Sequence, residues 1–223
     1  MDVVTQAKTT SVPGRMYRGE SHAARKKERQ DKLSAAALEI IGTEGFKAAT
    51  VRKVCREAGL TERYYYEAFG NAQGMLKLVY EQQIGRLAST LYEAVNSVEQ
   101  TPTAMAEAAL TSLFGAIKKD PRMARVIYIE IVGVSEELDE VYRKGQRRFD
   151  ELLVKLSKPL YPEENTADLD DLLMASALVG AITQVSRDWV LANFDRSITA
   201  LVNNMMALVV GVITHLQTRR PAR

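Results

Sequence analysis

The sequence predicts an all-α fold of about nine helices, and three observations carry this prediction. Apolar residues recur at the i, i+3, i+4 spacing of an amphipathic helix in most segments after residue 22. No stretch shows the strict alternation of apolar and polar residues that marks a half-buried strand. The chain has 223 residues, 46% of them hydrophobic and 26% charged, so it is large enough and apolar enough to bury a substantial core.

The N-terminal part is predicted to contain a tail and one helix. Residues 1–24 are rich in Thr, Ser, Gly and Pro and lack an apolar period, so we expect a flexible basic tail there. An apolar stripe from Leu33 to Ile41 then indicates a helix, which the glycines at 42 and 45 weaken and end.

Two short helices are expected next. Thr50 is placed to cap a helix that ends at Gly59, where a left-handed cap belongs. Thr61 is able to cap a further helix that runs through Phe69, before a loop over 70–72. We therefore predict a helix-turn-helix domain over residues 25–72.

The remainder, residues 73–218, is predicted to be a larger helical domain, followed by a C-terminal tail over 219–223. Proline positions and the capping residue Ser135 divide it into helices. The expected helical segments are roughly 76–98, 110–117, 121–131, 135–156, 167–192 and 195–217.

Charge is unevenly distributed along the chain. Residues 1–77 hold 14 Lys and Arg against 9 Asp and Glu, whereas the rest of the chain holds 16 against 19. A basic first third indicates contact with a polyanion. The single cysteine excludes an internal disulfide, and the two distant histidines offer no metal-ligand spacing. With short apolar runs and no leader segment, we expect a cytoplasmic protein with no cofactor, no metal and no membrane contact.

The expected third helix has the composition of a DNA-reading helix. On a helical wheel, Tyr65 and Phe69 lie on the core side, whereas Arg63 and Glu67 point away from it and pair one turn apart. Arginine reads guanine edges, and hydroxyls donate to phosphates. The basic run at 25–29 is either a solvated face or an arm that contacts DNA. The predicted DNA-binding residues are Arg25, Lys26, Thr50, Arg52, Thr61, Glu62, Arg63, Tyr64 and Tyr66.

These residues resemble a known family. The stretch TVRKVCREAGLTERYYYEAFGNAQGML, residues 50–76, is similar to the DNA-binding signature of TetR-type transcriptional regulators. It has the Thr-Val opening, the Ala-Gly turn, an aromatic pair that ends in Tyr, and a Phe three residues later. The similarity extends backward over residues 29–46. The resemblance implies that Thr50 and Arg52 lie near phosphate and that Tyr66 binds phosphate.

Three positions depart from the family pattern. The family usually has a small residue at position 63, a histidine or similar polar residue at 67, and a phosphate-binding lysine at 72, where this chain has Arg63, Glu67 and Ala72. The phosphate contact at 72 is therefore not expected here. Arg63 is expected either to replace the missing charge or to add a base contact.

The last two expected helices, about 167–192 and 195–217, are apolar nearly all round. Such helices need cover on every side, from a second subunit or from their own bundle. The resemblance implies that residues 73–218 are a ligand-binding and dimerisation domain. In it the last two helices pair two chains as a four-helix bundle, and a small apolar effector enters the core. The candidate ligand-binding residues are Phe114, Tyr128, Glu130, Phe149 and Trp189, each of which could instead be core packing.

The sequence thus predicts a homodimeric, sequence-specific DNA-binding transcriptional regulator, a repressor released from double-stranded operator DNA by a small apolar effector. The alternative is a helical small-molecule or lipid-binding protein, or an isoprenoid-type enzyme in which Asp168, Asp170 and Asp171 bind Mg²⁺. Acidic residues at a helix N-terminus are favoured by the helix dipole alone. Phosphate-binding, dinucleotide-binding and nucleophile-elbow motifs are absent from the sequence, which argues against an enzyme.

Overall fold

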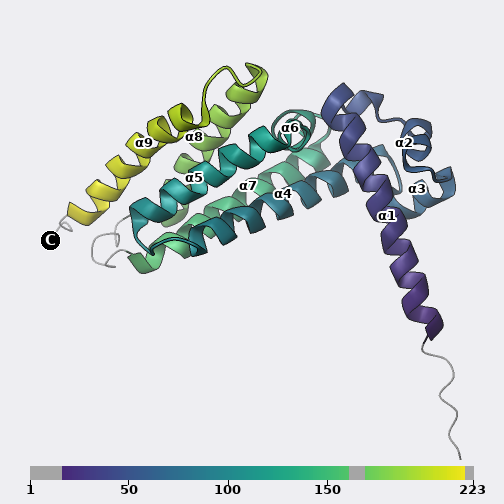
Figure 1. The fold of residues 1–223 in the computed structure, drawn as a ribbon, viewed down its shortest axis with the longest axis horizontal. Coiled ribbons are helices and arrows are strands. Elements are labelled where there is room, and N and C mark those ends of the chain that lie inside the picture. The colour runs from purple at the N-terminus through teal and green to yellow at the C-terminus, as the bar shows by residue number, and fades with distance from the viewer. Residues whose placement is uncertain (1–16, 161–168, 219–223) are drawn as a thin grey trace, which may run out of the picture.

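The computed structural model describes residues 17–160 and 169–218, and every regular element in those ranges is a helix (Figure 1). This confirms the all-α class. The elements are α1 (Tyr17–Glu44), η1 (Phe46–Ala48), α2 (Val51–Ala58), α3 (Glu62–Phe69), α4 (Ala72–Asn96), α5 (Pro102–Lys119), α6 (Pro121–Arg125), η2 (Val126–Glu130), α7 (Glu136–Ser157), η3 (Lys158–Leu160), α8 (Asp171–Leu191) and α9 (Ile198–Thr218).

The helices form a small head and a larger bundle (Figure 1). Helices α1, α2 and α3 make the head, and α4 leads from the head into the bundle, where it packs against α5 and α7. Helix α8 packs against α7, and α9 packs against α5. One buried cluster runs from α1 through the bundle, so head and bundle share a continuous core.

Helix α1 begins earlier than the sequence predicts. It starts at Tyr17, so residues 17–24 are helical and the expected tail over 1–24 is wrong for this part. Ala23, Ala24 and the basic run that follows are strong helix formers, which lets the helix extend beyond its packed half. The parts of the expected tails over 1–16 and 219–223 lie outside the described residues.

Two glycines have different roles at the end of α1. Gly42 lies within the helix. A β-carbon at this position would come within 2.2 Å of the Cβ atom of Arg122 on α6. The close crossing of α1 and α6 therefore requires this glycine. Gly45 has a φ of 95° and follows the last residue of the helix, so it is the glycine that ends α1.

The expected caps are partly confirmed. The hydroxyl of Thr50 accepts a hydrogen bond from the Lys53 amide, and Gly59 adopts the left-handed conformation with φ 65°. Thr61 stands at the start of α3, but its side chain makes no capping hydrogen bond. Asn71 caps α4 by accepting from the Gly74 amide, so the loop expected over 70–72 consists of Gly70 and Asn71, and Ala72 is the first residue of α4.

The segment expected as one helix over 121–131 is divided. Five residues of α6 are followed by the five-residue π-helix η2. A π-helical turn inside an α-helix is uncommon and is frequent at functional sites.

Asp150 of α7 is a buried carboxyl group whose Oδ1 atom has no hydrogen-bond partner. Burial raises its pKa, so the charged form destabilises the fold: the penalty is absent below the ordinary pKa of aspartate, grows as the pH rises, and is complete above the raised pKa. We expect Asp150→Asn to stabilise the protein at neutral pH by on the order of 1 kcal/mol. Thermal unfolding should show a higher Tm that returns to the wild-type value near about pH 4. The exposed Asp31→Asn is the control; an equal shift there would contradict the effect of burial.

Candidate functional site

The core side of α3 is fixed by aromatic packing. Tyr65 is fully buried, and its ring meets Phe69 edge-on with centroids 5.0 Å apart. The Tyr65 hydroxyl lies 3.5 Å from the sulfur of Met75 on α4. Burial raises the pKa of Tyr65 to about 12, so the phenol stays neutral. The predicted core face of the helix is confirmed, and its opposite face is turned to solvent.

Two ion pairs lie on the solvent face of the helix-turn-helix. The Nε atom of Arg63 donates to Glu67 Oε1 at 2.8 Å, as the one-turn spacing predicts. This hydrogen bond lowers the pKa of Glu67 and keeps the carboxylate charged. Arg52 lies 3.7 Å from Glu62 and joins α2 to α3. Both arginines are highly exposed, so each guanidinium group can leave its carboxylate partner and bind DNA instead.

The two tyrosines that flank Tyr65 differ. Tyr66 is 53% exposed, as expected of a residue that meets a partner surface. Tyr64, expected to face outward, is only partly exposed, because the Arg29 guanidinium of α1 stacks over its ring at 4.4 Å. The helical wheel of α3 alone could not show this cover, which comes from α1.

A basic cleft of about 590 Å³ lies between α1 and α3. Arg25 and Lys26 belong to it, which places them beside the outward face of α3. Sequence reasoning left His22 and Arg29 out of the predicted DNA-binding residues, although their i, i+3, i+4, i+7 spacing with Arg25 and Lys26 was a readable signal. The cleft is lined by His22, Arg25, Lys26, Arg29, Arg63, Tyr64 and Glu67.

The basic cleft leads to a prediction about salt dependence. Replacing Arg25 and Lys26 together by alanine should weaken binding to every DNA sequence alike, because phosphate contacts carry no base information. The slope of log affinity against log salt should become less steep by about 2, since each lost phosphate contact releases about one counterion fewer. A salt titration with operator and random DNA measures both. The exposed Arg86→Ala on α4 is the control. An unchanged slope in the double variant would mean that Arg25 and Lys26 face solvent and do not contact DNA.

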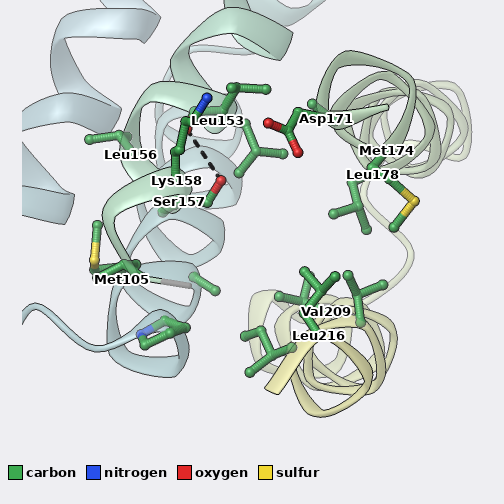
Figure 2. A pocket seen from close by; sticks show the side chains of 18 of the residues that line it. Met105, Leu153, Leu156, Ser157, Lys158, Asp171, Met174, Leu178, Val209 and Leu216 are labelled. Atoms are coloured by element: carbon green, nitrogen blue, oxygen red, sulfur yellow. Dashed lines mark hydrogen bonds between the residues drawn. The ribbon is translucent and has the colours of Figure 1, made fainter. Parts of the chain in front are cut away.

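A second candidate site lies in the bundle, away from the head. Two adjoining cavities of about 180 and 170 Å³ run between α4, α5, α7, α8 and α9. We call the two together the tunnel. Figure 2 shows one part of it, where Leu153 and Leu156 of α7 face Leu178 of α8 and Val209 of α9. The residues that line both cavities are Val95, Ala106, Ala109, Leu153, Leu156, Leu178 and Val209.

The tunnel wall is apolar except near its two ends. Towards the head it is lined by Tyr128, Gln146 and Thr183, and at the other end by Ser157, Lys158 and Asp171. An apolar wall with a few polar groups is typical of a small-molecule site.

Two of the five predicted ligand-binding residues, Tyr128 and Phe149, line the tunnel. The prediction is not supported for Phe114 and Trp189, which pack against each other with ring centroids 5.7 Å apart. The indole of Trp189 donates to the Arg196 carbonyl, which fixes it in the core. Sequence spacing marks all of these as buried but does not tell a filled core from a cavity wall.

Glu130 also lies away from the tunnel, at the junction of head and bundle. It accepts a hydrogen bond from the Phe46 amide at 2.8 Å and another from Arg125 Nε at 2.8 Å. Arg125 in turn donates to the Thr43 carbonyl at the end of α1. Because η2 carries both Glu130 and the tunnel residue Tyr128, this one turn touches the tunnel and the head.

The acidic run before α8 does not form a metal site in the described part of the chain. Asp170 is the N-cap of α8 and accepts from the Leu173 amide at 3.0 Å. Asp171 lies in the first turn of the helix, and Asp168 lies outside the described residues. Among described residues, no group of three or more metal-binding side chains comes together.

Comparisons with known proteins agree with this arrangement. The family model for bacterial regulatory proteins of the tetR family matches residues 33–79. The fatty acid metabolism regulator protein of Bacillus subtilis (strain 168) is 22% identical over 184 residues, which cover 80% of this chain and 92% of that protein.

Two solved structures share the fold. The fatty acid degradation regulator FadR from Bacillus halodurans superposes with a TM-score of 0.69 at 23% identity, over 81% of this chain and 97% of that one. FadR from Bacillus subtilis, solved in complex with stearoyl-CoA, gives a TM-score of 0.67 at 22% identity, over 80% and 96% of the two chains. The matched region contains α2 and α3, with the buried Tyr65 and the exposed Arg63 and Tyr66. Residues 33–79 therefore match the tetR family of bacterial regulatory proteins, and over most of its length the chain is similar to a bacterial regulator of fatty acid metabolism.

Proposed function

We propose that the protein is a homodimeric repressor that leaves its operator when a long-chain fatty acyl group occupies the tunnel. The observation that carries this proposal is the tunnel itself, which is long, narrow and apolar. The stearoyl-CoA bound to the similar Bacillus subtilis regulator supports the same ligand class. As a regulator that acts on bacterial DNA, the protein would work in the cytoplasm.

The length of the tunnel suits a long acyl chain. Along α7 and into η3 the lining runs from Gln146 to Lys158, twelve helical steps that rise roughly 18 Å. An extended hydrocarbon advances about 1.25 Å per carbon, given bonds of about 1.5 Å at tetrahedral angles, so about 14 carbons fit this length. Each buried methylene would contribute about 0.8 kcal/mol of binding free energy.

The dimer is proposed to form through α8 and α9. Five of the eight large apolar side chains that are exposed in the described residues lie on these two helices: Leu172, Leu173, Leu191, Leu208 and Val210. A second copy would bury this face and set two heads at the spacing of successive major grooves.

Helix α9 is long and apolar enough to cross a membrane by length and composition, with a mean hydropathy of 1.6, and 22% of its apolar stretch is buried. One side of α9 packs on α5, and its exposed side carries Asn203, Asn204 and His215. Polar groups of this kind are costly in hydrocarbon, so a protein partner suits this helix better than lipid.

The proposed route from ligand to DNA passes through η2. An acyl chain beside Tyr128 would move this turn, and with it the hydrogen bonds of Glu130 and Arg125 to the end of α1 and to η1. Arg122 adds a parallel connection, since it bonds both Glu39 of α1 and Asp120. Movement at these contacts would change the position of the heads and so their fit to two half-sites.

A mobility-shift experiment tests the proposed function. Operator fragments selected from the source genome are bound by the full chain at several salt concentrations, with and without palmitoyl-CoA. We expect sequence-selective, salt-dependent binding that palmitoyl-CoA lowers by at least tenfold. A lipid-binding protein that does not use DNA would bind palmitoyl-CoA and show no sequence preference. Palmitoyl-CoA that binds without changing operator affinity would exclude it as the inducer, because equal affinity for both states shifts nothing.

A further inference from the structure

Helices α7 and α8 run antiparallel, and their pairing shows where the tunnel approaches the surface. Gln146 of α7 donates to the Thr183 hydroxyl of α8 at 3.1 Å. Both side chains line the tunnel, and both are only partly buried. This bridge, which we call the neck, is therefore a polar point of the wall that is reached from the tunnel and from solvent.

Positive charge gathers outside the neck. One turn further along α8 lies Arg187, which is exposed. Burial raises the pKa of Tyr142, one turn before Gln146 on α7, and the charge of Arg187 opposes that shift, so the guanidinium lies close to the same end of α7. Arg143 and Arg147 flank Gln146 on the exposed side of α7.

The carboxylates near these cations do not cancel their charge. Glu140 is the partner of Arg143 at 2.8 Å and of Arg147 at 3.0 Å, so one carboxylate is shared by two guanidinium groups. Asp150 lies one turn beyond Gln146, and burial raises its pKa, which disfavours its charged form. Asp188, next to Arg187 on α8, is an exposed carboxylate that accepts a hydrogen bond from Gln184 at 2.9 Å. Three guanidinium groups, of Arg143, Arg147 and Arg187, thus stand against the two carboxylates of Glu140 and Asp188, which leaves an excess of positive charge outside the neck.

Among the described residues, the other end of the tunnel lacks this excess. Lys158 is the cation that lines it, and Asp171 lines the same end (Figure 2). Asp170 stands exposed beside it at the start of α8. An anionic group would meet as much negative as positive charge there.

We propose that the ligand lies in the tunnel with its anionic, phosphate-bearing head group at the neck, where Arg143, Arg147 and Arg187 bind it. Its apolar tail is directed towards Lys158. This assignment rests on the proposed function, because it presumes an acyl ligand. Gln146 and Thr183 would then hydrogen-bond the carbonyl group that joins tail to head. Arginine suits this role because its planar donors match phosphate oxygens in pairs.

The test compares three probes on the full chain: palmitoyl-CoA, palmitate and CoA alone. In the double variant Arg143→Ala/Arg187→Ala, the Kd for palmitoyl-CoA should rise at least tenfold, whereas the Kd for palmitate should stay within twofold. The difference should shrink at high salt, because the contacts are charged and exposed. Lys155→Ala and Arg148→Ala, which remove exposed cations outside the tunnel, should leave both affinities unchanged. Lys158→Ala removes the cation that lines the other end and should affect palmitoyl-CoA less than the double variant does. Unaltered operator binding without ligand shows that each variant is folded.

Several results would overturn the assignment. Loss of palmitoyl-CoA binding in Lys158→Ala but not in the double variant would place the head group of the ligand at the opposite end of the tunnel. An equal loss for palmitate and palmitoyl-CoA in the double variant would mean that the arginines support the fold of the tunnel and not the head group. If the wild-type chain binds neither acyl probe, the proposed acyl effector itself is wrong, and a regulator with another ligand remains. Tight binding of CoA alone would show that the site does not depend on the tunnel.

Discussion

Replacing Tyr66 by phenylalanine should weaken binding to operator and random DNA alike, while Arg63→Ala should in addition relax the preference at one base pair. Each change is expected to cost about 1 to 3 kcal/mol. The reason is geometric: Tyr66 is the exposed tyrosine of α3, and Arg63 projects from the face opposite the buried Tyr65. Affinities for the operator and for its single-base variants, measured at one salt concentration, separate the two effects.

The ion pair on α3 supplies a matched variant. Glu67→Gln removes the partner of Arg63 and a negative charge that faces the phosphates, so it should tighten DNA binding. Circular dichroism should show unchanged helicity in all three variants, because none of the side chains contributes to the core. Operator affinity that does not respond to Tyr66→Phe or to Arg63→Ala would mean that the outward face of α3 is not the reading surface.

A tryptophan at Ala109 should give a regulator that binds DNA normally and no longer responds to the acyl effector. Ala109 is one of the residues that line both cavities, so an indole there would obstruct the tunnel. We expect affinity for palmitoyl-CoA to fall at least 100-fold, which is about 2.7 kcal/mol. Operator affinity without ligand should match the wild type. Isothermal titration and mobility shift measure the two quantities.

The matched control for this variant is Glu107→Trp, on the exposed side of the same helix. It adds the same side chain outside the tunnel and should leave the response to the effector intact. If Ala109→Trp overpacks the helix bundle and lowers the Tm, Ala109→Leu replaces it, because leucine adds less volume and still narrows the tunnel. A full response to palmitoyl-CoA in a folded Ala109→Trp protein would place the effector outside the tunnel.

The sequence determined the helical class and the reading head by itself. Both follow from local rules: the 3.6-residue apolar period, the Thr50 cap and the left-handed Gly59 depend on neighbours within a few positions. The same rules separate buried Tyr65 from outward Arg63 and predict the pair of Arg63 with Glu67. The head could be predicted because its proposed DNA-binding function is assigned to one face of one short helix.

The ligand site could not be predicted in the same way, because a tunnel is made by several helices at once. Phe114, Phe149 and Trp189 have the same apolar character in sequence, yet only Phe149 lines the tunnel. Small residues such as Ala106 and Ala109, which leave the space open, carry no local signal of their own. A cavity is what packing leaves unfilled, and no single segment contains that information.

The contacts between head and bundle were likewise decided only by the tertiary structure. Glu130 lies between Ile129 and Ile131 in the sequence and was a candidate ligand-binding residue, but folding brings it to the Phe46 amide 84 residues away. Arg29 of α1 covers the ring of Tyr64 on α3. Gly42 of α1 leaves room for Arg122 on α6. Both contacts join helices that do not follow each other in the chain. Helix periodicity specifies which side of a helix is buried, whereas the identity of the helix that buries it depends on how all the helices pack together.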